Sequence, residues 1–415
     1  MTQRPFNRFN SPISRRDWVR YCGMTTAALP GLLAVSGLQG CGNSDHQSTG
    51  ESATDSTGSA AGRSESSGRK LGIALVGLGK YSEGQLAPAL EETNLCKLAG
   101  IVTGSPEKAE KWKKKYDIPA KNAYNYQTFD QIADNPDIDI IYVVLPNSLH
   151  AEYVIRAAKA GKHVICEKPL ATSAADAQKM IDACKKAGVK FSVGYRLHFE
   201  PYNREIMRLG QQKVYGPVKK IYAQNGQKEG YDTPWRLDKK LAGGGPLPDV
   251  GVYCIQGAIY TKGEVPIAVS AKYHPKTDLK KFKEVEEGMD FQLHFADGAI
   301  AECRTSYNDE YNLLRGETDQ GWFELSPAYA YEGQKGQTKE GKLDFEKVNQ
   351  QARQMDAFAD CVLNNKETTV PGEMGLRDVQ LLEAIYRAAD TGQKVSTKDV
   401  IQNAFDPVAA KATAS

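Results

Sequence analysis

The stretch LGIALVGLGKYS, residues 71–82, decides the fold of this 415-residue chain. Its first six residues form a short apolar run, as expected of a buried parallel strand. Gly77 permits a tight turn after the strand, and Gly79 lets the backbone approach a pyrophosphate. Residues 83–92 are compatible with a helix whose N-terminus faces that phosphate. The pattern predicts a dinucleotide-binding domain, and an ordinary strand–turn–helix is the alternative.

The second predicted strand, residues 98–102, leads to the residues that choose between the two nicotinamide dinucleotides. An NAD enzyme usually ends this strand with Asp or Glu, which binds the ribose 2′-hydroxyl. Here Thr103 and Ser105 follow the strand, and Lys108 lies one helical turn further on. Because small hydroxyls and a cation suit a 2′-phosphate, we expect NADP. Alternatively Ser105 is a helix N-cap beside a solvated Lys108, and both roles are compatible.

Strand-like and helix-like segments alternate as far as residue 195, which predicts a doubly wound parallel sheet. The expected strands are residues 138–145, 163–166 and 190–194, and the expected helices are residues 151–160 and 174–187. In such sheets the ligand lies at the carboxyl ends of the strands. The polar residues at these ends, which should line one cleft, are Asn147, His150, Glu167, Lys168 and Arg196.

After about residue 210 the pattern changes to longer strands of antiparallel type. The expected strands are residues 218–223, 267–273, 291–295, 299–304 and 322–325, with a hairpin turn at 296–298. Residues 349–365 and 374–391 return to helical periodicity and should pack back on both domains. The predicted fold class is α/β: an N-terminal Rossmann doubly wound parallel sheet, then a C-terminal α+β domain with a large open, mostly antiparallel sheet. A small sandwich unrelated to catalysis is the alternative.

Residues 1–70 have the composition of a targeting segment and a linker. Residues 1–42 resemble a twin-arginine export signal, because Arg15 and Arg16 precede a moderately apolar stretch that is too short and Gly-rich for a membrane span. Cys41 ends a sequence like a lipobox, so release into the periplasm and a lipid anchor at Cys41 are both open. The Ser/Gly-rich residues 43–70 predict a flexible linker.

The remaining chain divides into a nucleotide-binding domain and a second domain. We expect an NADP-binding Rossmann domain over residues 71–195, a substrate-binding and oligomerisation domain over 196–397, and a tail over 398–415. Composition excludes several other classes of protein. Fifty-three Lys and Arg against 51 Asp and Glu give no support to nucleic-acid binding. None of the eight cysteines forms a CxxC pair, so no metal is expected.

Six motifs together resemble one known family. They are GLGKY at 77–81, LPNSLH at 145–150, EKP at 167–169, GYR at 194–196, WRL at 235–237 and GGG through DVGVY at 243–253. This part of the chain, about residues 71–397, is similar to the glucose–fructose oxidoreductase/inositol dehydrogenase (Gfo/Idh/MocA) family, above all to its glucose–fructose oxidoreductase branch. The resemblance implies a tightly held NADP, a sugar oxidised at C1, and homo-oligomers, dimers or tetramers, paired through open sheets.

Three residues are predicted to be catalytic: Lys168, Asp249 and Tyr253. Sugar oxidation needs a base near the C1 hydroxyl and a hydride acceptor over C1. Asp249 and Tyr253 are spaced i, i+4, so a helix starting near Asp249 would set both on one face. Tyr253 would be the general acid/base, Lys168 its electrostatic partner, and Asp249 would orient a sugar hydroxyl. A packed aromatic, an ion pair and an N-cap are the respective structural alternatives.

The predicted binding residues follow from the motifs and the resemblance. The cofactor-binding set is Gly77, Gly79, Lys80, Tyr81, Thr103, Ser105, Lys108, Tyr126, Leu145, Asn147, His150, Glu167, Lys168, Arg196, Trp235 and Arg236. The substrate-binding set is Lys168, Arg196, Asp249 and Tyr253. For His150, Arg196 and Arg236 a purely structural role is open as well.

The function expected first is an exported sugar oxidoreductase that keeps its NADP and works by a ping-pong mechanism on two sugars. Free NADP should be scarce outside the cytoplasm, and a retained cofactor removes that difficulty. The alternatives are an NAD(P)-dependent glycosidase of the same fold, a dehydrogenase whose cofactor dissociates, and a non-catalytic sugar-binding lipoprotein. Tyr at position 253, where many relatives have His, argues against the glycosidase.

Overall fold

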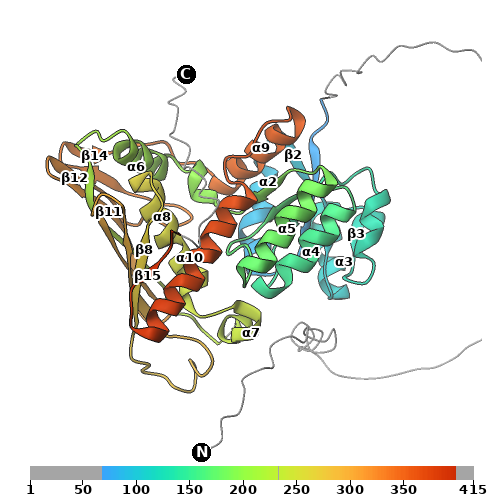
Figure 1. The fold of residues 1–415 in the computed structure, drawn as a ribbon. Helices are drawn as coiled ribbons and strands as arrows, with labels where there is room; N and C mark the ends of the chain where they lie inside the picture. Colours follow the sequence, from blue (N-terminus) through green and yellow to red (C-terminus); the bar gives the residue numbers. More distant parts are fainter. Residues whose placement is uncertain (1–67, 232, 399–415) are drawn as a thin grey trace, which may run out of the picture. The chain divides into compact units, whose positions relative to one another are not determined.

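The computed structural model describes residues 68–231 and 233–398, and both of its sheets lie in one compact unit that begins at Lys70 (Figure 1). The predicted export signal at 1–42, with Arg15, Arg16 and Cys41, lies outside the described residues, as do most of the predicted linker and tail. Within the described residues, no helix is long and apolar enough to cross a membrane.

The first sheet has six parallel strands in the order β3-β2-β1-β4-β5-β6, which confirms the predicted Rossmann sheet. Its central strand β1 is buried at every position, because helices cover both faces of a doubly wound sheet. The strands are β1 (Leu71–Val76), β2 (Cys96–Val102), β3 (Ala123–Tyr124), β4 (Ile140–Val143), β5 (His163–Cys166) and β6 (Phe191–Val193).

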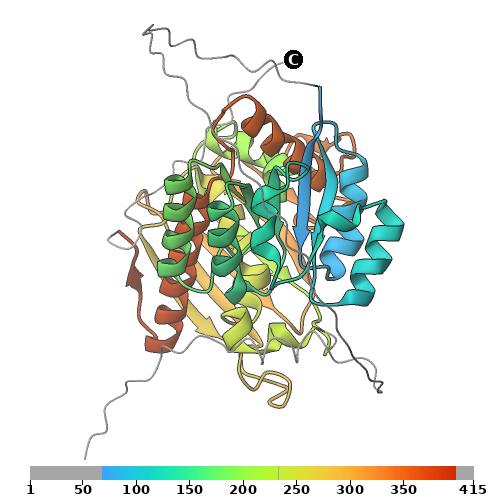
Figure 2. The same cartoon turned by 90° about the vertical axis from the view of Figure 1, so that its right-hand side faces the viewer.

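The helices around this sheet lie between its strands in the chain. The predicted helix after the glycine turn begins with the π-helical turn Ser82–Leu86 and continues as α2 (Ala87–Glu91). The others are α3 (Pro106–Tyr116), α4 (His150–Lys159) and α5 (Ala174–Ala187). Figure 2 looks onto α4 and α5, with the red helix α10 beside the green α5.

The second sheet has nine strands in the order β14-β13-β12-β11-β7-β10-β9-β8-β15. Only the β7–β10 pair is parallel among the paired strands that the structure describes, so the predicted mostly antiparallel sheet is confirmed. The strands are β7 (Val218–Gly226), β8 (Ala268–Tyr273), β9 (Gly288–His294), β10 (Ile300–Ser306), β11 (Tyr311–Thr318), β12 (Gly321–Leu325), β13 (Gly336–Thr338), β14 (Gly341–Leu343) and β15 (Val395–Ser396).

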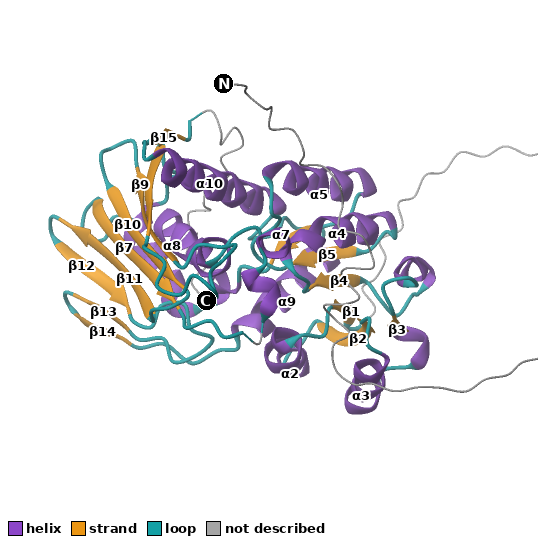
Figure 3. Cartoon of the chain, turned by 90° about the horizontal axis from the view of Figure 1, so that it is seen from below, coloured by secondary structure: helices purple, strands orange, loops and turns teal. Residues whose placement is uncertain are grey.

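Helices cover one face of the nine-stranded sheet, and on its other face the described residues place no helix (Figure 3). The helix α8 is buried at every position, as its apolar residues on all sides predict. The helices of this half of the chain are α6 (Pro201–Gln211), α7 (Lys239–Ala242), α8 (Val252–Lys262), α9 (Gln350–Leu363) and α10 (Gly372–Thr391).

The last two long helices connect the two sheets, as predicted. From α9, Met355 and Phe358 join the core around β1, together with Ile73 and Leu86. The helix α10 packs against α5 on one side and β8 on the other. The six described cysteines are buried and unpaired, in agreement with their interpretation as core thiols. The turn Asn147–Leu149 after β4 contacts α7.

Candidate active site

The glycine turn after β1 forms an open cradle. Gly77 has a φ of +96°, and a Cβ there would lie 2.2 Å from the carbonyl oxygen of Val144, so only glycine fits. At Gly79 an added Cβ would meet no atom within 4 Å, which leaves open space above the turn. The Ser82 hydroxyl donates to the Gly77 carbonyl at 2.6 Å and ties the turn to the following helix. The cradle fits the pyrophosphate of a dinucleotide.

The residues after β2 bring a cation to this cradle. Ser105 caps α3 by accepting a hydrogen bond from the backbone N–H of Lys108 at 3.3 Å, so the N-cap interpretation is confirmed. Lys108 Nζ also donates to the carbonyl of Leu78 in the glycine turn at 3.3 Å. Thr103 is buried and accepts from the backbone N–H of Ser105. Hydroxyls and an ammonium beside the turn, with no carboxylate among them, fit a 2′-phosphate.

Lys168, Asp249 and Tyr253 come together at the end of β5. Lys168 Nζ donates to the Asp249 carbonyl at 2.7 Å and to its Oδ1 at 3.2 Å, and lies 4.7 Å from the centre of the Tyr253 ring. Asp249 lies inside the π-helical turn Leu247–Gly251, which runs directly into α8, so the helical placement of both residues is confirmed. The N-cap alternative for Asp249 is wrong, because its side chain bonds Lys168 and Tyr307 instead.

In this cluster the Asp249 carboxylate lies between two cations, Lys168 and Arg236. Tyr307 donates to Asp249 Oδ2 at 2.8 Å, and Arg236 Nε lies 3.1 Å from the same oxygen. Burial alone would raise the pKa of Asp249, but Arg236 and Lys168 outweigh it and lower that pKa to about 2. Burial alone would lower the pKa of Lys168, but Tyr253 and Asp249 outweigh it and raise that pKa. Asp249 is therefore an anion, and Lys168 a cation, at neutral pH.

Arg236, predicted to bind the cofactor and with a structural role also open, belongs to this charge network. Its NH1 lies 3.4 Å from Oε2 of the buried Glu229, and its Cζ lies 5.3 Å from the ring centre of Trp235. The Arg236 guanidinium therefore forms ion pairs with both Asp249 and Glu229. Sequence reasoning missed Glu229 and Tyr307, because neither belongs to a motif and both reach Asp249 or its partner only through the tertiary fold.

Three further predicted cofactor ligands hold the main chain near the carboxyl ends of the parallel strands. The ring nitrogens of His150 lie 3.0 Å from the Pro169 carbonyl and 2.9 Å from the Leu145 carbonyl. Asn147 donates to the Ala242 carbonyl at 2.8 Å. The guanidinium of Arg196 donates to the carbonyls of Tyr329, at 2.7 Å, and Ala330, at 3.0 Å. Buried polar groups take the nearest partners, and here the partners are backbone carbonyls.

Glu167 lies beside Lys168 and is hydrogen-bonded to a buried tyrosine. Its Oε1 accepts from the Tyr142 hydroxyl at 2.7 Å, and Gln354 of α9 donates to that hydroxyl at 2.8 Å. Burial raises the pKa of Glu167. A Cβ at Gly194 would lie 2.6 Å from Oε1, so the glycine of the GYR motif makes room for this carboxylate.

The other predicted cofactor ligands lie at the glycine turn or, in the case of Tyr126, against α4. The Leu145 side chain lies against Gly77, and Tyr81 stacks on Tyr331 with ring centres 5.9 Å apart. Lys80 is exposed at the start of the helix after the glycine turn. Tyr126 packs edge-on against Tyr153 of α4, 5.5 Å between ring centres.

Comparison with known proteins agrees with this geometry. Family models match residues 71–195 ("Oxidoreductase family, NAD-binding Rossmann fold"), 203–325 ("GFO/IDH/MocA C-terminal domain") and 327–397 ("Oxidoreductase family, C-terminal alpha/beta domain"). The solved aldose-aldose oxidoreductase from Caulobacter crescentus is 42% identical with a TM-score of 0.77, and the match covers 79% of this chain and 100% of that one.

Curated relatives are more distant but match over most of their length. D-xylose 1-dehydrogenase [NADP(+)] from Haloarcula marismortui is 29% identical over 341 residues, 78% of this chain and 92% of the relative. D-glucoside 3-dehydrogenase from Escherichia coli is 26% identical over 352 residues, 78% of this chain and 97% of the relative. Family models over both halves of the described fold, and a solved relative covered from end to end, place this protein in the Gfo/Idh/MocA family of oxidoreductases.

Proposed function

We propose that this protein oxidises an aldose at C1 to the lactone with a tightly bound NADP, and that a second sugar reoxidises the cofactor. The observation that carries the proposal is the Lys168–Asp249–Tyr253 cluster at the end of β5, on the sheet whose β1 leads into the glycine cradle. The similarity to a solved aldose-aldose oxidoreductase supports sugars on both sides of the reaction.

The residues of the cluster divide the chemistry between them. A bound nicotinamide supplies the hydride acceptor. Tyr253 takes the proton of the C1 hydroxyl at its phenolic oxygen and returns it to the second sugar. Lys168 Nζ and Arg196 Cζ lie 4.7 and 5.2 Å from the centre of its ring, so two cations lie beside the residue that receives the proton. Asp249 keeps Lys168 in place and orients a sugar hydroxyl.

The preference for NADP rests on Lys108. The Haloarcula relative is named for NADP(+), whereas a levoglucosan dehydrogenase of the same fold was solved with NADH. The Lys108→Met change should therefore weaken NADP binding about tenfold or more and leave NAD binding nearly unchanged. Lys111→Met, on the same helix but paired with Glu83 at 2.6 Å, is the matched control. Equal losses for NADP and NAD would contradict the 2′-phosphate site.

The first test identifies the nucleotide that the protein carries. The folded protein is purified without added nucleotide and denatured, and what it releases is identified by chromatography and absorbance. We expect near-stoichiometric NADP(H), and then a lactone and a reduced sugar in equal amounts when aldoses are added. Released NAD would contradict the cofactor assignment. An empty protein would contradict the retained cofactor and the ping-pong mechanism.

We further propose export to the periplasm through the twin-arginine route, supported by Arg15, Arg16 and the apolar stretch that follows them. After export, the protein is either released into the periplasm by cleavage of the signal or held at the membrane by a lipid anchor at Cys41. A protein that folds before export carries its NADP out with it. Cell fractionation of the full chain against an Arg15→Lys, Arg16→Lys variant checks the route, and an unchanged periplasmic fraction would contradict it.

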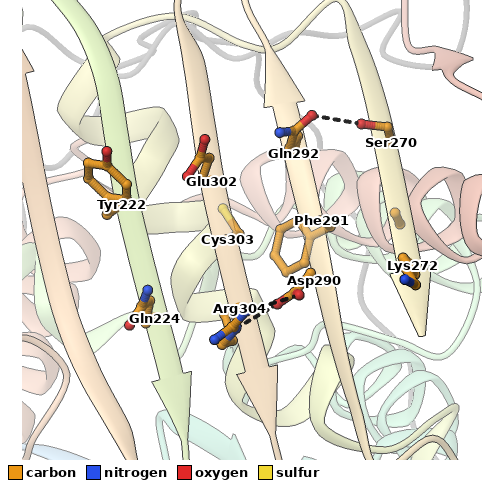
Figure 4. A pocket seen from close by; sticks show the side chains of 11 residues that line it. Tyr222, Gln224, Ser270, Lys272, Asp290, Phe291, Gln292, Glu302, Cys303 and Arg304 are labelled. Carbon is orange, nitrogen blue, oxygen red and sulfur yellow. Dashed lines mark hydrogen bonds and ion pairs between the residues drawn. The ribbon is translucent and has the colours of Figure 1, made fainter. Parts of the chain in front are cut away.

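We also propose that two copies of the chain pair through the outer face of the nine-stranded sheet. This face has a hollow of about 530 Å³ lined by side chains of β7, β8, β9 and β10 (Figure 4). Two ion pairs lie within this face: Arg304 Nε is 2.7 Å from Asp290 Oδ1, and Lys220 Nζ is 3.0 Å from Glu302 Oε1. A second copy can cover these ion pairs without leaving either partner of a pair alone.

A further inference from the structure

The loop 326–335 between β12 and β13 reaches from the second sheet to the nucleotide-binding residues. Gln350 at the start of α9 donates to the Tyr331 carbonyl at 2.6 Å, and Asn312 of β11 accepts from the backbone N–H of Tyr329 at 2.7 Å. Two side chains from other parts of the chain, Arg196 and Asn203, also donate to its main-chain carbonyls, and Gln334 of the loop itself donates to the Ala330 carbonyl. This loop is therefore held from several sides rather than loosely connected.

The loop places one partly exposed aromatic ring beside the glycine turn. Tyr331 is 44% exposed, yet its ring stacks on Tyr81 with centres 5.9 Å apart and planes at 30°. The Cζ of Arg196 lies 4.4 Å from the centre of the same ring. Tyr81 belongs to the GLGKY motif, so this stack joins the second half of the chain to the residues of the cradle.

The stack continues to the proposed catalytic residue. Arg196 Cζ also lies 5.2 Å from the ring centre of Tyr253, so Tyr81, Tyr331, Arg196 and Tyr253 form one series. Burial raises the pKa of Tyr331. Tyr253 and Glu167 raise it further, whereas Arg196 and Lys168 lower it. Tyr331 therefore lies in the same electrostatic environment as the catalytic cluster, at the junction between that cluster and the glycine turn.

We propose that Tyr331 is a cofactor-retaining residue: loop 326–335 holds its ring against Tyr81, and this contact keeps Tyr81 in place beside the glycine turn and slows the departure of the dinucleotide. The inference rests on the proposed function, which needs a cofactor that stays bound through both half-reactions. The stack of Tyr331 on Tyr81, and the cation–π contact of Arg196 with the Tyr331 ring, oppose movement of Tyr81 away from the glycine turn.

The test measures nucleotide release without any sugar. Each protein is loaded with NADPH, and the loss of its bound fluorescence is followed after addition of excess NADP. We expect Tyr331→Ala to release NADPH about 10 to 100 times faster than the wild type, and Tyr331→Phe, which keeps the ring, to stay within about threefold. Phe345→Ala is the matched control, because Phe345 is a 36% exposed aromatic that packs on Tyr202 instead. An unchanged rate for Tyr331→Ala, or wild-type release within seconds, overturns the proposal.

A second pair of variants keeps the proposal testable if Tyr331→Ala does not fold. Tyr331→Leu keeps an apolar side chain without a ring and should also release NADPH faster. Combined with Tyr81→Leu, it should release NADPH no faster than the faster single variant, because both changes remove the same contact. If the increases in release rate of the two single variants multiply in the double variant, Tyr331 and Tyr81 act independently and the proposal is overturned. If the protein releases NADPH slowly but oxidises no sugar, the result contradicts the proposed function and leaves the role of Tyr331 intact.

Discussion

Tyr253 is the residue on which the proposed proton transfer depends. Tyr253→Phe removes one hydroxyl and keeps the ring that packs 6.0 Å from Tyr329. We expect the rate of reduction of bound NADP by an aldose to fall about 10² to 10⁴-fold, while nucleotide content and melting temperature stay unchanged. Single-turnover absorbance at 340 nm measures the rate, with Tyr222→Phe on the outer sheet face as the control. A loss smaller than tenfold would assign the proton transfer to another group.

Arg236 and Lys168 together lower the pKa of Asp249, and Arg236 has the larger effect. In the Arg236→Met variant Asp249 retains Lys168 and Tyr307, so we expect a loss of about 2 kcal/mol in the free energy of unfolding at pH 7. The pKa of Asp249 is about 2 in the folded protein and about 3.9 unfolded. The stability from its charge is therefore complete above about pH 4 and disappears as the pH falls toward 2.

The difference between wild type and Arg236→Met should shrink over that same pH window. Urea unfolding at pH 7 and at pH 3 measures it. The control is Arg208→Met, which removes a surface pair with Glu205 and should cost about 0 to 1 kcal/mol. A difference that does not change with pH would show that Arg236 acts through packing and not through the charge of Asp249.

At the scale of elements, the turn between β1 and α2 contains two glycines with different roles. Gly77 is needed for the shape of the turn, and Gly79 for nucleotide binding. Gly77→Ala would set a Cβ 2.2 Å from the Val144 carbonyl at a φ of +96°, so we expect about 1 to 3 kcal/mol of lost stability together with lost nucleotide binding. Gly79→Ala meets no atom, so its methyl should weaken only nucleotide binding. Thermal unfolding of the nucleotide-free proteins and NADP titration distinguish the two. Equal destabilisation by both would contradict the open cradle at Gly79.

The segment before Asp249 shows how tightly an element can be held. The buried Glu286 accepts from the backbone N–H groups of Gly245, at 2.9 Å, and Leu247, at 3.1 Å, and from the Tyr386 hydroxyl at 2.8 Å. A Cβ at Gly244 would lie 1.8 Å from that hydroxyl. The glycine run therefore permits close approach, and the groups that approach are Glu286 and Tyr386 of the protein itself.

At the scale of the whole molecule, the outer face of the nine-stranded sheet decides assembly. Gln292 lines the hollow on that face, and Ser270 Oγ donates to its Oε1 at 3.2 Å (Figure 4). Gln292→Arg adds an unpaired charge there, so we expect the wild type to be a dimer or larger and the variant to shift to monomer by at least tenfold in dissociation constant. Gln178→Arg on α5 is the control. A monomeric wild type in light scattering would contradict pairing through this face.

The sequence by itself determined the parallel sheet, the glycine cradle, the N-cap at Ser105 and the helical placement of Asp249 and Tyr253. Each of these depends on residues that are adjacent or one helical turn apart, so hydrophobic period and glycine position carry the signal. The short strands β13 and β14 and the polar strand β11 were missed, because their pairing and not their composition makes them strands.

Only the tertiary structure decided what the polar residues of the cleft do. Tyr307 reaches Asp249 across 58 positions, Arg196 reaches Tyr329 across 133, and Tyr331 meets Tyr81 from the other half of the chain. The same fold gives Arg236 two carboxylate partners and His150 two backbone carbonyls, which their sequence motifs did not indicate. A buried charge or hydroxyl must be satisfied by whatever the folded chain brings near it, and no local pattern of residues records which distant group that will be.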